Sequence, residues 1–258
     1  MNIEKAPKPT LIIADDERDI LEFLTDDLEE DYHILPATNG KEVMELLENN
    51  SVQLIISDIM MPEMDGYELC AALKSNIEYS HIPLILLTAK NTLESKIKGL
   101  EEGADAYIEK PFSPAHLQAQ IQSLLSNRFK IRLYFHNSPL VPINSMAYTN
   151  TDKEFLDQIN QLITDNLINK DLSVEFLAEK LHISRATLYR KIKGVSDLTP
   201  NELINLSRLK KAAELLQQGH LKIFEVAYAV GFNSQTHFGR NFQKQFGLTP
   251  SEYAKKDK

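Results

Sequence analysis

Three carboxylates, a hydroxyl and an ammonium group each stand at the end of a short apolar run of the sequence: Asp15, Asp16, Asp58, Thr88 and Lys110. Carboxylates held close together repel one another, and a hard divalent cation such as Mg²⁺ relieves that repulsion by binding their oxygens. The cation would neutralise the oxygens of a phosphoryl group while a free carboxylate attacks phosphorus. These residue types therefore indicate phosphoryl chemistry at a magnesium site.

Parallel strands would bring these groups together. The apolar runs that favour strands are Leu11–Ala14, Tyr32–Ala37, Leu54–Ser57, Leu84–Thr88 and Ala106–Glu109, and helical patterns of apolar residues separate them. This alternation predicts an α/β fold, a doubly wound five-stranded parallel sheet with helices on both faces. Functional groups of such sheets gather at the carboxyl ends of the strands, so we expect the polar residues at that edge.

The segment Asp58-Ile59-Met60-Met61-Pro62-Glu63-Met64-Asp65-Gly66 resembles the phosphoacceptor loop of response-regulator receiver domains. Asp15-Asp16, Thr88-Ala89 and Lys110-Pro111-Phe112 match the other signatures of that family in order and spacing. The resemblance covers residues 9–127 and implies a CheY-like, flavodoxin-like fold. It also implies that a sensor histidine kinase is the phosphoryl donor.

The resemblance implies a role for each of these residues. Asp58 would accept the phosphoryl group, and Mg²⁺ would be held, directly or through water, by Asp15, Asp16, Asp58 and the backbone carbonyl of Met60. Lys110 would pair with the phosphoryl oxygens, and its bond to Pro111 is expected to be cis. Thr88 would swing towards the phosphoaspartate while Tyr107 turns inward.

Each residue taken alone has a simpler role open to it. Asp15 and Asp16 would serve equally to cap the helix that follows them. Lys110 would serve as a solvated surface charge, Thr88 as an ordinary strand residue and Tyr107 as a packing residue. Their joint order along the sequence favours the phosphoacceptor interpretation.

Charge divides the chain into an acidic part and a basic part. Residues 1–127 hold 9 Lys and Arg against 24 Asp and Glu, a net charge of −15, whereas residues 128–258 hold 19 against 13, a net charge of +6. The basic part is therefore a candidate for contact with nucleic-acid phosphates. The turn-rich stretch around Asn137–Ser145 predicts a linker at residues 128–150.

The basic part has helical periodicity throughout and contains an internal duplication. Leu177–Lys193 and Val226–Lys244 resemble each other, and each predicts two helices joined by a tight turn. A second helix with a polar outer face after a short turn has the form that enters the major groove of DNA. We therefore expect an all-α domain with two helix-turn-helix units, joined by a long helix at Pro200–Gln217.

Two stretches, Ala227-Tyr228-Ala229-Val230-Gly231-Phe232 and Phe242-Gln243-Lys244-Gln245-Phe246-Gly247-Leu248-Thr249-Pro250, make residues 151–258 similar to the AraC-family DNA-binding domain. This resemblance implies double-stranded promoter DNA as the ligand. Carried over by position, it assigns base contacts to Arg185, Ala186, Tyr189, Arg190, Gln235, Thr236, Gly239 and Arg240, and phosphate contacts to Arg208 and Lys244. His182 departs from the family, which usually has Gly in this turn, and a left-handed backbone there would cost about 1 kcal/mol.

Composition argues against several other classes of protein. No apolar run reaches the roughly 18 residues that a membrane span needs. The lone Cys70 excludes an internal disulfide and favours a cytoplasmic protein. The seven histidines lack metal-ligand spacing, and no nucleophile–base pair or phosphate-binding glycine loop occurs, so an enzyme is not expected.

The two parts together predict a two-component transcription regulator. Phosphorylation of Asp58 would favour a homodimer of receiver domains, and pairing would tighten binding to repeated DNA sites. The alternative is a phosphoryl sink or relay whose second domain is only an interaction module. The segment Asn127-Arg128-Phe129-Lys130 and the pairing of domain types resemble the carboxyl end of hybrid two-component regulators. Whether the kinase lies on the same natural chain or on a separate protein stays open.

Overall fold

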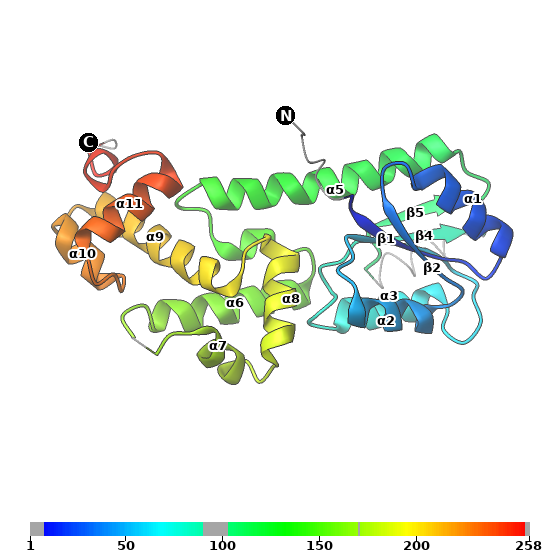
Figure 1. Ribbon diagram of the computed structural model, residues 1–258, viewed down its shortest axis with the longest axis horizontal. Coiled ribbons are helices and arrows are strands. Elements are labelled where there is room, and N and C mark those ends of the chain that lie inside the picture. Colours follow the sequence, from blue (N-terminus) through cyan, green and yellow to red (C-terminus); the bar gives the residue numbers. More distant parts are fainter. Residues whose placement is uncertain (1–7, 90–102, 170, 256–258) are drawn as a thin grey trace, which may run out of the picture. The chain divides into compact units, whose positions relative to one another are not determined.

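The structure is a computed structural model that describes residues 8–89, 103–169 and 171–255. The chain divides into two compact units, Met1–Arg128 and Phe129–Lys258 (Figure 1). Among the described residues, no helix has the length and apolar character needed to cross a membrane.

The first unit is built on a five-stranded parallel sheet with the strand order β2-β1-β3-β4-β5. Its strands are β1 (Thr10–Ala14), β2 (His33–Ala37), β3 (Leu54–Asp58), β4 (Leu84–Thr88) and β5 (Ala106–Glu109). The sequence-based prediction of all five strands is confirmed to within one residue at each end, and so is the doubly wound α/β fold.

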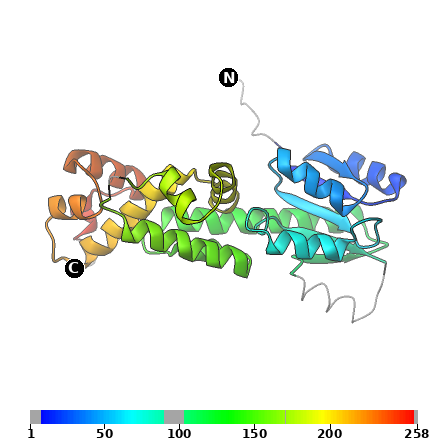
Figure 2. The ribbon, with the colours of Figure 1, turned by 90° about the horizontal axis from the view of Figure 1, so that it is seen from below.

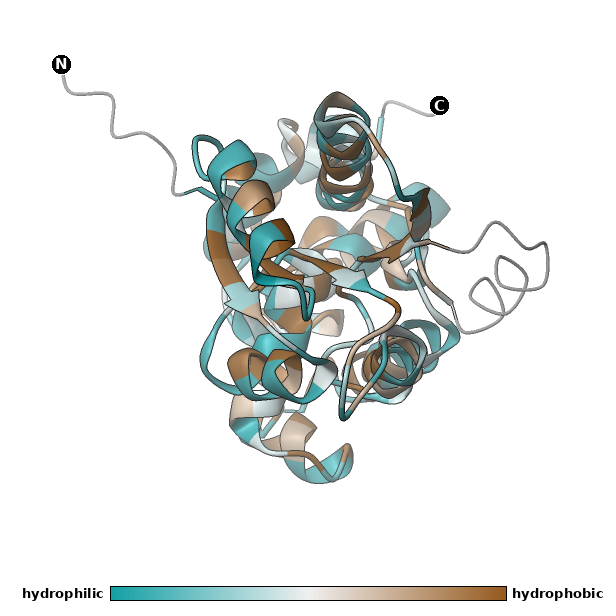
Figure 3. Cartoon of the chain, turned by 90° about the vertical axis from the view of Figure 1, so that its right-hand side faces the viewer, coloured by the Kyte–Doolittle hydropathy of each residue, from teal (hydrophilic) through white to brown (hydrophobic). Residues whose placement is uncertain are grey.

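Helices cover both faces of this sheet: α1 (Arg18–Leu28) and α5 (Pro114–Asn137) on one face, α2 (Gly40–Asn49) and α3 (Gly66–Ser75) on the other (Figure 1). Leu24 and Ile121 are buried on the first face, and Val43 and Leu69 on the second. Because both faces are covered, the strands are apolar along almost their whole length, as the hydropathy colouring shows (Figure 3).

The second unit is helical throughout its described residues. Its elements are the end of α5, a 3₁₀ turn η1 (Ile143–Met146), α6 (Asn150–Asp165), α7 (Val174–Lys180), α8 (Arg185–Ser196), α9 (Pro200–Gln218), α10 (Ile223–Ala229), α11 (Gln235–Phe246) and α12 (Pro250–Tyr253). Side chains of Ser173, Ser184 and Ser234 accept hydrogen bonds from backbone amides at the starts of α7, α8 and α11. The two predicted helix-turn-helix units, α7–α8 and α10–α11, are thereby confirmed.

Helix α9 is the central element of this unit and contacts α6, α8, α10, α11 and α12 (Figure 2). Leu209 and Leu216 of α9 belong to the same buried cluster as Phe238 and Phe242 of α11. The two phenylalanines are 0% exposed, so both pack inward. The rings of Phe238 and Phe242 pack against each other with their centroids 5.6 Å apart.

The segment predicted to be a linker, residues 128–150, is packed rather than free. Helix α5 continues through the start of this segment to Asn137. Phe135, Ile143 and Met146 are at most 4% exposed. Turn residues at Asn137–Pro139 and at Pro142 divide the apolar residues of this stretch into short groups, so no periodic pattern reveals this burial.

Candidate functional site

The carboxyl ends of four strands bring the predicted phosphoacceptor residues to one edge of the sheet. Asp58 is the last residue of β3, Thr88 is the last of β4, and the pairing register places Asp58 beside Leu87. Asp15 follows β1 directly and is 1% exposed, whereas Asp58 is 7% exposed. Two carboxylates are therefore buried at the position that the sequence predicts.

Asp15 and Asp58 converge on the ammonium group of Lys110, which follows β5 directly. Lys110 Nζ lies 2.7 Å from Asp15 Oδ2 and 2.5 Å from Asp58 Oδ1. The other oxygens also accept hydrogen bonds: Asp15 Oδ1 from the amide of Glu17 at 3.0 Å, and Asp58 Oδ2 from the amide of Met60 at 2.6 Å. Asp15 thus uses its oxygens inside the pocket and does not cap α1 through its side chain.

Burial and pairing shift the proton affinities in this pocket. Burial raises the pKa of Asp15 above its ordinary value, and hydrogen bonds from Lys110 and the Glu17 amide offset part of that effect. Burial alone would lower the pKa of Lys110, but its hydrogen bonds to Asp15 and Asp58 outweigh burial and raise that pKa. The lysine is consequently held in its charged form between the two carboxylates.

A divalent metal would need oxygen ligands at this edge. Within residues 8–89, 103–169 and 171–255, no group of three His, Cys, Asp or Glu side chains lies close enough to hold a metal ion. The side chain of Asp16 is exposed, Lys110 supplies a positive charge beside Asp15 and Asp58, and binding of a metal by the three carboxylates stays a prediction. The donor set still fits Mg²⁺ in kind, because two buried carboxylates already converge on a cation and the remaining predicted ligands are oxygens.

The remaining residues of the predicted pocket lie beside this cluster. The Lys110–Pro111 bond is cis, as expected. The amide of Lys110 donates to the carbonyl of Thr88 at 2.8 Å, and the side chain of Thr88 is buried. Tyr107 of β5 is half-buried against the core cluster that α2 and α3 form with the sheet. A change in the positions of Thr88 and Tyr107 on phosphorylation stays a prediction.

Gly66 is a residue whose role at this site the sequence did not reveal. Its amide donates to the carbonyl of Ile59 at 2.9 Å, which brings the start of α3 against the end of β3. A Cβ at this position would lie 2.5 Å from the carbonyl oxygen of Asp58. Only glycine allows α3 to begin this close to the phosphoacceptor.

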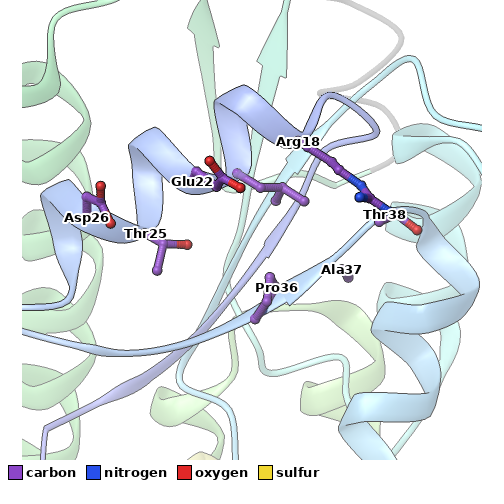
Figure 4. Close-up of a pocket in the computed structure, with 8 residues that line it drawn as sticks. Arg18, Glu22, Thr25, Asp26, Pro36, Ala37 and Thr38 are labelled. Atoms are coloured by element: carbon purple, nitrogen blue, oxygen red, sulfur yellow. The ribbon is translucent and has the colours of Figure 1, made fainter.

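The first unit has a further open hollow between α1 and β2, lined by Arg18, Glu22 and Thr25 on the helix and by Pro36 and Thr38 near the strand end (Figure 4). None of the residues that the sequence predicted for the phosphoacceptor pocket lines it. The hollow is therefore a separate feature of the surface.

In the first helix-turn-helix unit, the predicted base contacts lie on the outer face of α8. Arg185, Ala186 and Arg190 are exposed, and Tyr189 is partly exposed. The Arg185 guanidinium pairs with Glu175 of α7 at 2.8 Å, and both side chains are more than half exposed. This face is accessible, as contact with DNA requires, and the contact itself stays a prediction.

The second helix-turn-helix unit presents a similar face on α11. Gln235, Thr236, Arg240 and Lys244 are all exposed. Gly239 is partly exposed, and a Cβ built on it would have no heavy atom within 4 Å. The protein itself thus leaves room for a side chain at position 239.

The predicted contact of Arg208 with DNA phosphates stays a prediction. Arg208 lies on α9 and is partly buried, and its Nη2 donates to the carbonyl of Leu167 at 3.1 Å. Burial lowers the pKa of its guanidinium below the ordinary value. The side chain is directed at the protein because the turn at Gly231 packs on the same carbonyl.

Known protein families match both units. The family described as response regulator receiver domain matches residues 11–122, and the family described as helix-turn-helix domain, which is AraC-type, matches residues 177–256. The probable transcriptional regulator ycf27 of Cyanidium caldarium is 35% identical over 178 residues, which is 68% of this chain and 68% of that protein. The chain belongs to the response regulators.

Two further similarities are found. Histidine kinase P4 of Formosa agariphila is 39% identical to this response regulator over 251 residues, which is 97% of the chain and 18% of that protein. The chain thus spans less than a fifth of that relative's length. The solved signal receiver domain of a histidine kinase from Syntrophus aciditrophicus is 38% identical, covering 46% of this chain and 91% of that chain with a TM-score of 0.45.

The combination of a receiver domain with an AraC-type helix-turn-helix domain is that of a regulator rather than an enzyme. Relatives described as transcriptional regulators have the same implication. This response regulator is accordingly a transcription-factor type of protein.

Proposed function

We propose that this response regulator accepts a phosphoryl group on Asp58 from a sensor histidine kinase and that the modification controls its binding to promoter DNA. The observation that carries the proposal is the convergence of two buried carboxylates, Asp15 and Asp58, on the Lys110 ammonium at the carboxyl edge of the sheet. Two buried negative charges and one positive charge leave the pocket ready for a second cation.

The phosphoryl step uses a carboxylate oxygen of Asp58. One Asp58 oxygen attacks phosphorus, the phosphorus–nitrogen bond to the kinase imidazole breaks, and the imidazole leaves with the bonding electron pair and takes up a proton. Lys110 then pairs with the phosphoryl oxygens, since its ammonium already lies 2.5 Å from the attacking side chain. The kinase is a proposed partner, favoured by the relative named as a histidine kinase.

A magnesium ion is the proposed cofactor of this step. Asp15, Asp16, Asp58 and the Met60 carbonyl would hold it, because Mg²⁺ prefers oxygen ligands. When bound, Mg²⁺ would neutralise charge on the transferring phosphoryl group. The work of the chain's own residues is to orient Asp58 through the Met60 amide and to keep Lys110 charged.

The second unit would carry the output. Its two outward helix faces, on α8 and α11, fit successive major-groove segments of one duplex. Lys244 would contact phosphates, whereas Arg185, Ala186, Tyr189, Arg190, Gln235, Thr236, Gly239 and Arg240 would contact bases. Pairing of phosphorylated receivers into a homodimer would raise the local concentration of these faces on repeated DNA sites.

The phosphoryl step is tested with the purified chain, a radiolabelled small acyl phosphate and Mg²⁺. The wild type should gain label that survives acid and is lost in alkali, as an acyl phosphate requires, and Asp58→Ala should gain none. Asp26→Ala, which removes an exposed carboxylate of α1, is the matched control and should label like the wild type. Equal labelling of Asp58→Ala would contradict the proposal.

The DNA part is tested by varying salt. Binding to a duplex selected from a random-sequence pool should weaken steeply as salt rises, because each phosphate contact displaces counterions. A chain that takes phosphoryl label but selects no DNA would instead be the sink or relay that the sequence also allows.

A further inference from the structure

The last turns of α5 contact helices of both helix-turn-helix units. Residues 132–137, called here the α5 end, lie in the second unit. Arg132 and His136 hydrogen-bond to the end of α8, while α9 and α11 supply Lys210 and Gln245, which hydrogen-bond to α5 carbonyls. Three separate helices therefore meet at this short segment.

Side chains of the α5 end satisfy the carbonyl end of α8. The last four carbonyls of a helix have no partner within the helix and need donors from elsewhere. The amide of Asp197 donates to the carbonyl of Lys193. Arg132 donates to the carbonyl of Val195 at 3.0 Å and to that of Gly194, and His136 Nε2 donates to the carbonyl of Ser196 at 2.9 Å. Because a carbonyl only accepts, His136 must carry its proton on Nε2. All four carbonyls of α8 are thus satisfied, three of them by α5.

The carbonyls at the end of α5 and just after it accept hydrogen bonds from the other helices. Lys210 of α9 donates to the carbonyls of Phe135 at 2.8 Å, Ser138 at 2.5 Å and Val141 at 3.1 Å. Its ammonium also lies 4.2 Å from the centroid of the Phe135 ring. Gln245 of α11 donates to the carbonyl of His136 at 2.8 Å. His136 therefore touches α8 through its ring and α11 through its carbonyl.

We propose that the α5 end positions the two recognition helices, α8 and α11, relative to each other, so that both fit one DNA duplex at the same time. Arg132 and His136 are positioning residues in this proposal and make no contact with DNA. The proposal rests on the proposed function, since it concerns how the same DNA-binding faces are arranged. It gives a role to the segment whose sequence suggests only a linker.

The geometry favours positioning over simple capping. Where a cap is local, a neighbouring residue supplies it: the side chains of Ser173 and Thr199 accept hydrogen bonds from the first amides of α7 and α9. The carbonyl end of α8 instead uses donors about 60 residues earlier in the chain, and the carbonyls at the end of α5 accept from donors on two further helices. Hydrogen bonds of this kind fix the angle between helices as well as satisfying their ends.

The first test measures the relative position of α8 and α11 without DNA. Spin labels are placed on Lys193→Cys and Gln243→Cys of the full chain, which is possible because the native Cys70 is buried. Pulsed electron spin resonance should give one narrow distance peak for the otherwise wild-type chain and a broadened or shifted peak for Arg132→Ala. Lys130→Ala removes one positive charge from the exposed side of the same helix and should leave the peak unchanged.

Milder changes guard against loss of folding. Arg132→Lys retains a positive donor and should broaden the peak less than Arg132→Ala, and His136→Gln retains a side-chain donor. Circular dichroism identifies the variants that remain folded. A peak that stays as narrow as the wild type in every folded variant would overturn the proposal.

The second test compares two duplexes, one selected from a random-sequence pool by the full chain and one in which half of the contacted segment is scrambled. The wild type should prefer the intact duplex, and Arg132→Ala should lose about tenfold or more of that preference while its affinity for the scrambled duplex stays nearly unchanged. Equal losses on both duplexes would mean that Arg132 acts only on stability. A wild-type chain that selects no DNA would contradict the proposed function. The distances between the spin labels would still decide the role of the α5 end.

Discussion

Lys191 of α8 and Asp152 of α6 form an ion pair in which neither side chain has any exposure to solvent. The other oxygen of Asp152 accepts hydrogen bonds from the amides of Tyr148 and Thr149, each at 3.2 Å. The ammonium also lies over the Phe155 ring, 5.8 Å from its centroid. A buried charge on α8, the second helix of the first helix-turn-helix unit, thus anchors that helix in the interior.

Removal of one partner should be costly. Lys191→Met leaves the Asp152 carboxylate buried without its counter-charge, and we expect a loss of about 3–5 kcal/mol in the free energy of unfolding. The double variant Lys191→Met/Asp152→Asn should recover part of that loss, because the amide oxygen still accepts hydrogen bonds and carries no charge. Chemical denaturation measures both values.

Lys193 on the same helix is the control for this prediction. It pairs with Asp197, and the two side chains are 57% and 66% exposed. Lys193→Met should therefore cost no more than about 1 kcal/mol. Similar losses for Lys191→Met and Lys193→Met would show that burial of the first pair has no energetic consequence.

The pairing of Arg185 with Glu175 predicts a gain in DNA affinity. Glu175→Gln removes a carboxylate that lies 2.8 Å from the guanidinium and would compete with DNA for it. Exposed pairs of this kind are worth at most ~1 kcal/mol, so the affinity should rise by about fivefold or less. Arg185→Ala should lower affinity, and fluorescence anisotropy at constant salt measures both. A drop in affinity for Glu175→Gln would mean that the pair orders Arg185 for binding.

The turns of the two helix-turn-helix units predict opposite effects on stability. His182 has a φ of 54° and Gly231 has a φ of 84°, so both turns use the left-handed backbone that favours glycine. His182→Gly should stabilise the chain by about 1 kcal/mol, because it removes the strain of a side chain in that conformation. Gly231→Ala should destabilise by more than about 2 kcal/mol, since its Cβ would lie 2.0 Å from the Leu167 carbonyl oxygen. Thermal unfolding distinguishes the signs, and equal shifts would contradict the expectation.

Lys210 predicts a dependence of stability on alkaline pH. Burial lowers its pKa from 10.5 to about 8. Between these values the unfolded chain binds more protons at this residue than the folded chain, so the free energy of unfolding should rise with pH across that window. Denaturation of the wild type and of Lys210→Met at pH 7 to 10 isolates this contribution as a difference. A difference that falls with pH would mean that the three carbonyls around Lys210 hold its proton more tightly than water does.

Most of the fold was predictable from local patterns in the sequence. Strand ends at Asp15, Asp58 and Lys110 were predictable because a continuous apolar run ends one or two residues before each. Ser184 and Ser234 were predictable as helix starts for a similar reason, since the cap and the first turn are neighbours in sequence. The acidic pocket followed from these local features together with the parallel-sheet rule.

Contacts between distant residues were not predictable in this way. Arg208 reaches Leu167, Lys210 reaches Val141, and their burial depends on packing that no local window shows. Lys191 did leave a signal, because it falls on the same helical stripe as Leu188 and Val195, three residues after one and four before the other. The convergence of Lys110 on two carboxylates likewise depends on side-chain placement.

The link between the two units is tested most directly by titrating one selected DNA duplex with the wild type and with Asp58→Ala, each before and after incubation with a phosphoryl donor and Mg²⁺. We expect phosphorylation to tighten binding by the wild type by about five- to 150-fold, the range of coupling free energies of ~1–3 kcal/mol, and to leave Asp58→Ala unchanged. Binding curves that coincide for both proteins under phosphorylating conditions would show that the acidic pocket does not control the DNA-binding unit.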